Sequence, residues 1–303
     1  MVAIKCKLPS LNMGNILKKC KRSIFHTLLH IAAESGIDKM VTIILEMEEI
    51  CVNQPDIHGQ TPLITASWKG HVKTVSILLN KEDIDVNYTS HNGSTALYTA
   101  ALNGYDKIVK LLLEKEDILV NRCTPCGTTP LLIASYEGHV GIVKMLLQKK
   151  ETDIKHANKY GTTALFSALH KGHVMIAKII LEKESTLMNI SNSSGHTPLL
   201  LAAYYGFDKV VEYIIEKENI QLNAPDQYGN TPLFVASKKG HNNVVKMLLK
   251  KEDIEVNQAN MVGATPLSVA AETRNGSVVN LLLGTQAIRA VGWNGWRPIA
   301  NAA

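Results

Sequence analysis

The chain has 303 residues, of which 46% are hydrophobic, 19% charged and 5% aromatic, a composition that excludes a disordered or collagen-like polypeptide. Its apolar runs fall short of the roughly 20 residues that a membrane-spanning helix needs, and its basic start lacks the apolar core of a secretory signal. The formal net charge is +5, but residues 1–26 carry +6 and residues 284–303 carry +2, while residues 27–283 hold 24 basic and 27 acidic groups. The basic excess therefore belongs to the two ends of the chain.

The basic segment at residues 1–26 has two interpretations. It contains six Lys or Arg residues, no acidic residue and several apolar residues among them. We expect either a capping helix over residues 15–24 that covers the start of the folded body, or an arm that contacts an anionic membrane or nucleic acid.

From residue 27 onward the sequence repeats every 34 residues, in eight copies without insertion or deletion. Each copy begins with a Thr that is followed, in all copies but the first, by Pro-Leu or Ala-Leu. The Thr residues are Thr27, Thr61, Thr95, Thr129, Thr163, Thr197, Thr231 and Thr265. An Ala stands five residues after each Thr, and a Gly stands nine residues after it in every copy except the last, which has Arg274.

Each repeated position has a physical interpretation. Thr caps the first turn of a helix, Pro fits the first helical position, and Gly adopts the left-handed conformation that ends the helix. The pattern predicts a short inner helix followed by an outer helix, such as residues 72–79 with apolar residues at helical spacing, and then a turn-rich hairpin. One copy cannot bury a core, so the copies are expected to stack side by side.

The segment GQTPLITASWKGHVKTVSILL, residues 59–79, resembles the ankyrin repeat family, whose pattern includes T-P-L-H-x-A. Two departures are that the His survives only as His30 and that the period is 34 rather than 33. The resemblance implies an all-α ankyrin-repeat solenoid of helix-turn-helix units with connecting β-hairpin loops. It divides the chain into a basic segment or capping helix at 1–26, an array of about eight repeats at 27–283 and a C-terminal tail at 284–303.

The resemblance also implies a function. Ankyrin arrays act as scaffolds or adaptors that bind a partner protein on their concave face, so we expect no enzyme activity, no cofactor and no metal site. We expect a monomer in the cytoplasm or nucleus. Two alternatives stay open, namely an adaptor tethered to anionic membrane or nucleic acid by the basic N-terminus, and a regulatory fragment of a larger enzyme.

In related arrays the contacts come from the hairpin tips and from the two residues immediately before the inner-helix Gly, which we call the first and second slot of a repeat. The partner-binding residues expected on this basis are Trp68, Lys69, Leu102, Tyr136, Tyr160, His170, Lys171, Tyr204, Tyr205, Tyr228, Lys238 and Lys239. Exposed aromatic rings are typical anchors of interfaces, and the lysines favour an acidic or phosphorylated partner. The alternative is that some rings cover the inner helices and that the lysines are merely solvated.

Other motifs do not indicate catalysis. His71, His139, His173 and His241 share one repeat position, but stacked helices about 8–10 Å apart cannot direct them to one zinc ion, so we expect them to hydrogen-bond loops. The pair Cys123 and Cys126 has the spacing of redox and zinc sites but lacks a second pair. No phosphate-binding loop, H-E-x-x-H or G-x-S-x-G occurs.

Two hairpin segments, LNKEDIDVN and LKKEDIEVN, resemble the sites that asparaginyl hydroxylases modify in ankyrin proteins. The resemblance implies hydroxylation at Asn87 and Asn257, although the same Asn also serves as a structural hairpin residue in the family. The tail holds Trp293 and Trp296, which either fold over the last repeat or contact a partner.

Overall fold

The computed structural model describes residues 13–47 and 50–285, with side chains from residue 24 onward. The described residues form two compact units, one within residues 1–130 and 148–152 and the other within residues 131–147 and 153–303. Trp293 and Trp296 lie outside the described residues.

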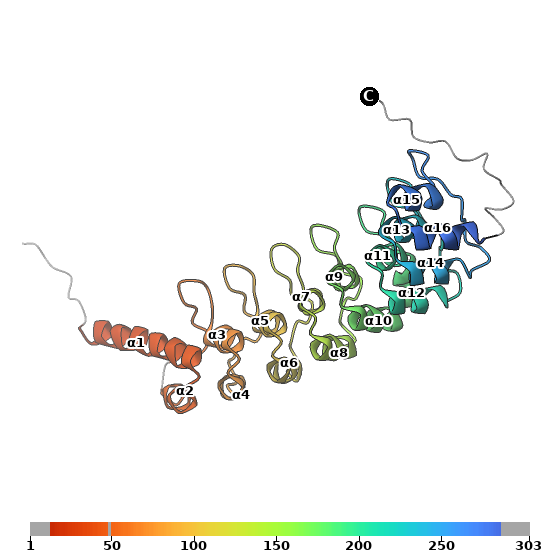
Figure 1. Cartoon of the computed structure of the whole chain (residues 1–303). Coiled ribbons are helices and arrows are strands. Elements are labelled where there is room, and N and C mark those ends of the chain that lie inside the picture. Colours follow the sequence, from red (N-terminus) through yellow and green to blue (C-terminus); the bar gives the residue numbers. More distant parts are fainter. Residues whose placement is uncertain (1–12, 48–49, 286–303) are drawn as a thin grey trace, which may run out of the picture. The chain divides into compact units, whose positions relative to one another are not determined.

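The first unit alternates inner helices, which carry the slots, with outer helices that follow them in sequence (Figure 1). Inner helices α1, α3 and α5 pack against one another in order, and so do outer helices α2, α4 and α6. The bounds are α1 Met13–Ser35, α2 Asp38–Leu45, α3 Pro62–Lys69, α4 Val72–Leu79, α5 Ala96–Asn103 and α6 Asp106–Leu113.

The second unit continues the same alternation, with inner helices α9, α11, α13 and α15 packing in series and α10, α12, α14 and α16 doing so behind them. The bounds are α7 Pro130–Glu137, α8 Val140–Gln148, α9 Ala164–Lys171, α10 Val174–Lys183, the 3-10 helix η1 Ser185–Asn189, α11 Pro198–Tyr205, α12 Asp208–Ile215, α13 Pro232–Lys239, α14 Asn242–Leu248, α15 Pro266–Glu272 and α16 Gly276–Leu283. The serial helix pairs confirm the predicted all-α solenoid.

The expected Thr and Gly caps are confirmed for the inner helices α3, α5, α9, α11 and α13. In α11, for example, the Leu200 amide donates to the Thr197 hydroxyl at 3.2 Å, and Gly206 ends the helix at φ 75°. The alanines that stand five residues after each Thr are all fully buried between the helices. They are Ala32, Ala66, Ala100, Ala134, Ala168, Ala202, Ala236 and Ala270. Small side chains here allow the inner helices to approach closely.

The first repeat differs from the prediction. No helix begins at Thr27, because α1 runs without interruption from Met13 to Ser35. The first copy has Leu28 where later copies have Pro or Ala, and no Gly-containing turn precedes its Thr, so nothing in the sequence stops the helix from extending backwards. The helix expected over residues 15–24 is therefore present, but it is continuous with the first inner helix.

The loops between repeats are hairpin-shaped but hold little β-structure. Among the described residues, one isolated antiparallel bridge joins Ala157 to Thr163. Each loop closes on itself through a tight turn instead. In the loop before α3, the Asp56 amide donates to the Gln60 carbonyl at 2.9 Å and the Gly59 amide donates to the Asp56 carbonyl at 3.0 Å. We call these loops fingers and their turns fingertips.

Candidate functional site

The slot residues lie at the C-terminal ends of the inner helices, where the left-handed Gly turns the chain away and leaves the preceding side chains in solvent. The exposed fraction is 45% for Trp68, 38% for Tyr136 and 37% for Tyr204. These three rings are thus too exposed to act as core residues. Leu102 and Tyr205 are half-buried, whereas His170 and the slot lysines are exposed.

A regular contact links the slots of successive repeats. The second-slot residue of one repeat reaches back to the first-slot residue of the repeat before it, 35 positions earlier. Two of these contacts place an ammonium over a ring, with Lys171 Nζ 4.2 Å from the Tyr136 ring centroid and Lys239 Nζ 4.5 Å from that of Tyr204. Four described pairs follow this rule: Lys69–Glu34, Lys171–Tyr136, Tyr205–His170 and Lys239–Tyr204.

Tyr205 is the centre of an aromatic cluster in the second unit. Its hydroxyl lies 2.8 Å from His170 Nδ1, its ring meets the Tyr204 ring edge-on at 5.0 Å, and it stacks on Phe207 at 5.5 Å with 21° between the planes. Burial raises the pKa of the Tyr205 hydroxyl above its ordinary value of 10.0. These contacts restrict the rotamers of the slot rings before any partner arrives, which reduces the entropy lost on binding.

The backbone at the slots is also held in place. His173 Nε2 lies 3.0 Å from the Tyr136 carbonyl oxygen, and His241 Nε2 lies 2.9 Å from that of Tyr204. In the first unit His71 Nε2 makes the equivalent 2.8 Å contact with the Glu34 carbonyl. His71, His173 and His241 thus contact carbonyl oxygens in the last turns of inner helices, whereas the sequence predicted contacts with loops. The described residues contain no group of three or more His, Cys, Asp or Glu side chains that could hold a metal ion.

The slot lysines differ in charge environment. Lys69 Nζ lies 3.1 Å from the Glu34 carboxylate, so the ion pair offsets its charge. Lys171 instead contacts Tyr136, and the side-chain hydrogen bond with Tyr136 is the main cause that raises the pKa of Lys171 above 10.5, with Glu137 contributing less. Lys171 therefore keeps a full positive charge at neutral pH.

The fingertips form a second exposed set of residues. Tyr160 and Tyr228, both expected from the sequence, are 73% and 60% exposed. Three further apolar fingertip residues are more exposed still: Ile57 at 86%, Met261 at 76% and Val262 at 78%. Sequence reasoning missed these three, although they occupy the central positions of turns that begin at Asp56 and Asn260, where side chains point outward.

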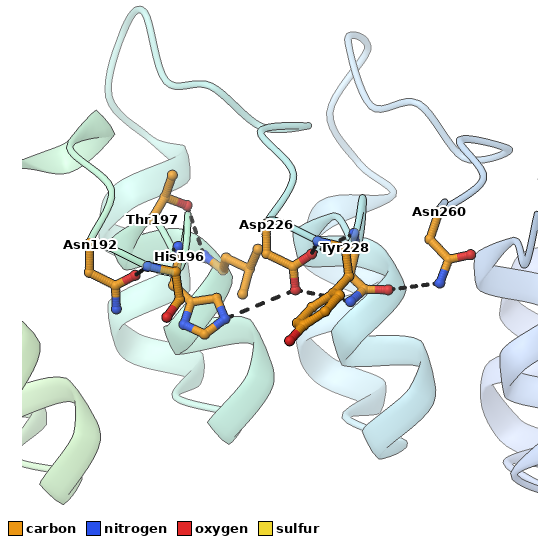
Figure 2. Close-up of polar contacts among 9 residues, drawn as sticks. Asn192, His196, Thr197, Asp226, Tyr228 and Asn260 are labelled. Carbon is orange, nitrogen blue, oxygen red and sulfur yellow. Dashed lines mark hydrogen bonds and ion pairs between the residues drawn. The ribbon is translucent and has the colours of Figure 1, made fainter. Parts of the chain in front are cut away.

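Hydrogen bonds to the buried Asp226 carboxylate fix the fingertip that carries Tyr228 (Figure 2). The Tyr228 amide donates to Asp226 Oδ1 at 2.8 Å, and the Asn230 amide donates to the same oxygen at 2.9 Å. His196 Nε2 of the preceding finger lies 4.0 Å from Asp226 Oδ2. In addition, the Met261 amide donates to the Tyr228 carbonyl at 3.0 Å, which joins two neighbouring fingertips. The exposed rings thus stand on ordered backbone.

Asn87 has a structural role in the first unit. Its Nδ2 donates to the Asp117 carbonyl at 2.8 Å, and its Oδ1 accepts from the Leu119 amide at 2.8 Å, so the side chain joins one finger to the next. Asn53, Asn189 and Asn223 make the same two contacts 30 and 32 residues further on. Hydroxylation at Asn87 and Asn257 stays a prediction.

The two cysteines at 123 and 126 are free, exposed thiols in one finger. Pro125 between them packs against Gly93 of the preceding finger, where an added Cβ would come within 2.4 Å of Pro125 Cδ. This packing gives the segment a structural role.

The comparisons identify the repeat. A family model described as ankyrin repeats in three copies matches residues 1–90, 29–122, 82–158, 115–191, 150–226, 184–261 and 218–290. A search of curated proteins finds no match to the chain. In the part of the chain that the structure describes, no helix combines the length and apolarity needed to cross a bilayer.

Proposed function

The chain belongs to the ankyrin repeat family, whose repeats generally serve as protein–protein interaction modules, and we propose that it is a non-enzymatic adaptor that binds a partner protein through its slots and fingertips. One observation carries the proposal. Tyr136 and Tyr204 are exposed at the ends of inner helices, yet the next repeat holds each ring and its backbone in place. Large, pre-ordered, solvent-facing rings of this kind are typical hot spots of interfaces.

The continuity of helix α1 favours the capping interpretation of the basic N-terminal segment over a tether to membrane or nucleic acid. Helix α1 joins residues 13–26 to the first inner helix without a break, so this stretch is part of the first repeat's helix. We further propose that the chain acts as a monomer in the cytoplasm or nucleus, which sedimentation of the purified protein and cell fractionation would check.

The test of the adaptor function is affinity capture from lysate with a slot variant and a matched control. The double variant Tyr136→Ala/Tyr204→Ala should lose captured partners by roughly tenfold or more, because truncating hot-spot rings costs about 2 kcal/mol or more each. Its helicity by circular dichroism should match wild type, since both rings are exposed.

Tyr213→Ala is the control, because Tyr213 lies on outer helix α12 and also contacts two lysines, with Lys217 Nζ 4.5 Å and Lys178 Nζ 5.4 Å from its ring centroid. It should capture the wild-type set of proteins. Recovery of that same set by the folded slot variant would contradict the proposal.

A further inference from the structure

The slots of the fifth, sixth and seventh repeats form a basic surface in the second unit. They contain His170, Lys171, Lys238 and Lys239 and no acidic residue, and all four are exposed. The acidic slot residues lie outside this stretch: Glu34 in the first repeat, Glu137 in the fourth and Glu272 in the eighth. We call the four residues the basic slot patch. The patch is local, because residues 27–283 as a whole hold more acidic than basic groups.

The lysines of this patch keep charge that a partner can use. Lys171 and Lys239 lie over the rings of Tyr136 and Tyr204, at 4.2 and 4.5 Å from the centroids, and a ring attracts an ammonium without cancelling its charge. The second-slot lysine of the first unit, Lys69, is instead paired with the Glu34 carboxylate at 3.1 Å. The same position thus carries a lysine in a direct ion pair in the first unit, and lysines held on rings in the second, where Glu137 acts on Lys171 only as a weaker electrostatic neighbour.

The spacing of the two held lysines indicates an extended ligand. Lys171 and Lys239 are two repeats apart, and packed helices lie about 8–10 Å from one another, so the ammonium groups are separated by roughly 16–20 Å. An extended peptide covers that distance in about five or six residues, at roughly 3.3 Å per residue.

The rings argue against a single-stranded nucleic acid, which needs free aromatic faces for stacking bases. Lys171 covers one face of the Tyr136 ring, and Lys239 covers one face of the Tyr204 ring. The Tyr205 ring stacks on Phe207. The ring surface left for base stacking is thereby reduced, and the ammonium groups suit carboxylates.

We propose that the basic slot patch binds an extended acidic segment of the partner protein, with Glu or Asp side chains about five or six residues apart meeting Lys171 and Lys239. The inference rests on the adaptor function proposed above and specifies the chemistry of the partner. Lys238 adds positive charge beside the second of these contacts.

The test is fluorescence anisotropy of the full chain with a short fluorescein-labelled peptide of alternating glutamate and serine, beside the same peptide with glutamine in place of glutamate. We expect the glutamate peptide to bind more tightly, and Lys171→Gln/Lys239→Gln to weaken it roughly five- to tenfold, as expected for two solvent-accessible ion pairs. The matched control is Lys209→Gln/Lys246→Gln, which removes two exposed lysines from outer helices α12 and α14. It should change the affinity less than twofold.

Several results would overturn the inference: no binding of the glutamate peptide, equal binding of the glutamine peptide, equal losses in the two lysine variants, or tighter slot-dependent binding of a labelled oligothymidine. The outcome is separable from that of the adaptor test. If captured partners depend on Tyr136 and Tyr204 but tolerate Lys171→Gln/Lys239→Gln, the adaptor function stands and the acidic-segment inference falls.

Discussion

At the scale of single residues, Gly206 shows how the slots are held. Its φ of 75° lies in the left-handed region, and a Cβ added there would come within 2.6 Å of His241 Nδ1. The same imidazole contacts the Tyr204 carbonyl through Nε2 at 2.9 Å. Glycine is therefore required at position 206 for two reasons: it adopts the left-handed turn that ends α11, and it leaves room for the His241 ring that contacts the slot backbone.

Gly206→Ala should lower the free energy of unfolding by roughly 1–3 kcal/mol, because an L-residue in this conformation is strained and the His241 ring must move. Urea denaturation followed by circular dichroism would measure the change. The control is Gly276→Ala, since Gly276 begins helix α16 and an added Cβ there meets no atom within 4 Å. That variant should be neutral or stabilised by up to about 1 kcal/mol. Equal destabilisation of the two variants would refute the conclusion that the conformation of Gly206 and its contact with His241 require glycine at this position.

At the scale of elements, the fingers are joined by asparagine side chains. Asn87 occupies both polar atoms of its amide with the Asp117 carbonyl and the Leu119 amide of the next finger. The contact recurs at Asn53 in the same unit. Because these bonds connect neighbouring repeats, they contribute to the coupling between them.

Asn87→Ala should lower the free energy of unfolding by about 1–2 kcal/mol, since it removes two net-favourable hydrogen bonds in a solvent-accessible loop. Asn80→Ala provides the comparison, because Asn80 is an exposed residue at the end of α4, and its change should stay within about 0.5 kcal/mol. Thermal or urea melts of the two variants side by side would check this. A stability for Asn87→Ala equal to wild type would show that the asparagine contacts do not stabilise the fold.

Local sequence chemistry was enough to predict most elements. A Thr such as Thr197 and a Gly such as Gly206 specify the two ends of an inner helix through their own backbone preferences, so the 34-residue period determined where the helices fall. The helix α1 departed from prediction because the first copy lacks a stop signal. The 3-10 helix η1 was not predicted either. The copy that holds η1 buries two successive apolar residues, Leu187 and Met188, at 3% and 4% exposure, whereas the second copy buries Val86 at the position equivalent to Met188.

The contacts between slots were beyond sequence reasoning. The residue types at Tyr136 and Lys171 could be read from the alignment of copies, but their pairing depends on how one inner helix is offset against the next. Lys238 and Lys239 are neighbours in the sequence, for example, yet it is Lys239 that lies over the Tyr204 ring. Stacking geometry decides this, and no local propensity reports it.

At the scale of the whole molecule, the basic residues are divided among separate regions. The termini hold the overall excess, the body between them is slightly acidic, and the basic slot patch stands out against that body within the second unit. A partner with an acidic segment would be attracted to the patch, while the acidic body would disfavour nonspecific binding of polyanions.

Site-specific photo-crosslinking would show directly whether a partner protein contacts the slots. Benzoylphenylalanine would replace Tyr204 in one protein and Tyr213 in another, which places the same reactive ring on inner helix α11 or on outer helix α12. We expect a crosslinked partner from position 204, suppressed by Lys171→Gln/Lys239→Gln where an acidic segment meets the basic slot patch, and little or none from position 213. Crosslinking of the same partner from position 213 with none from position 204 would contradict this expectation.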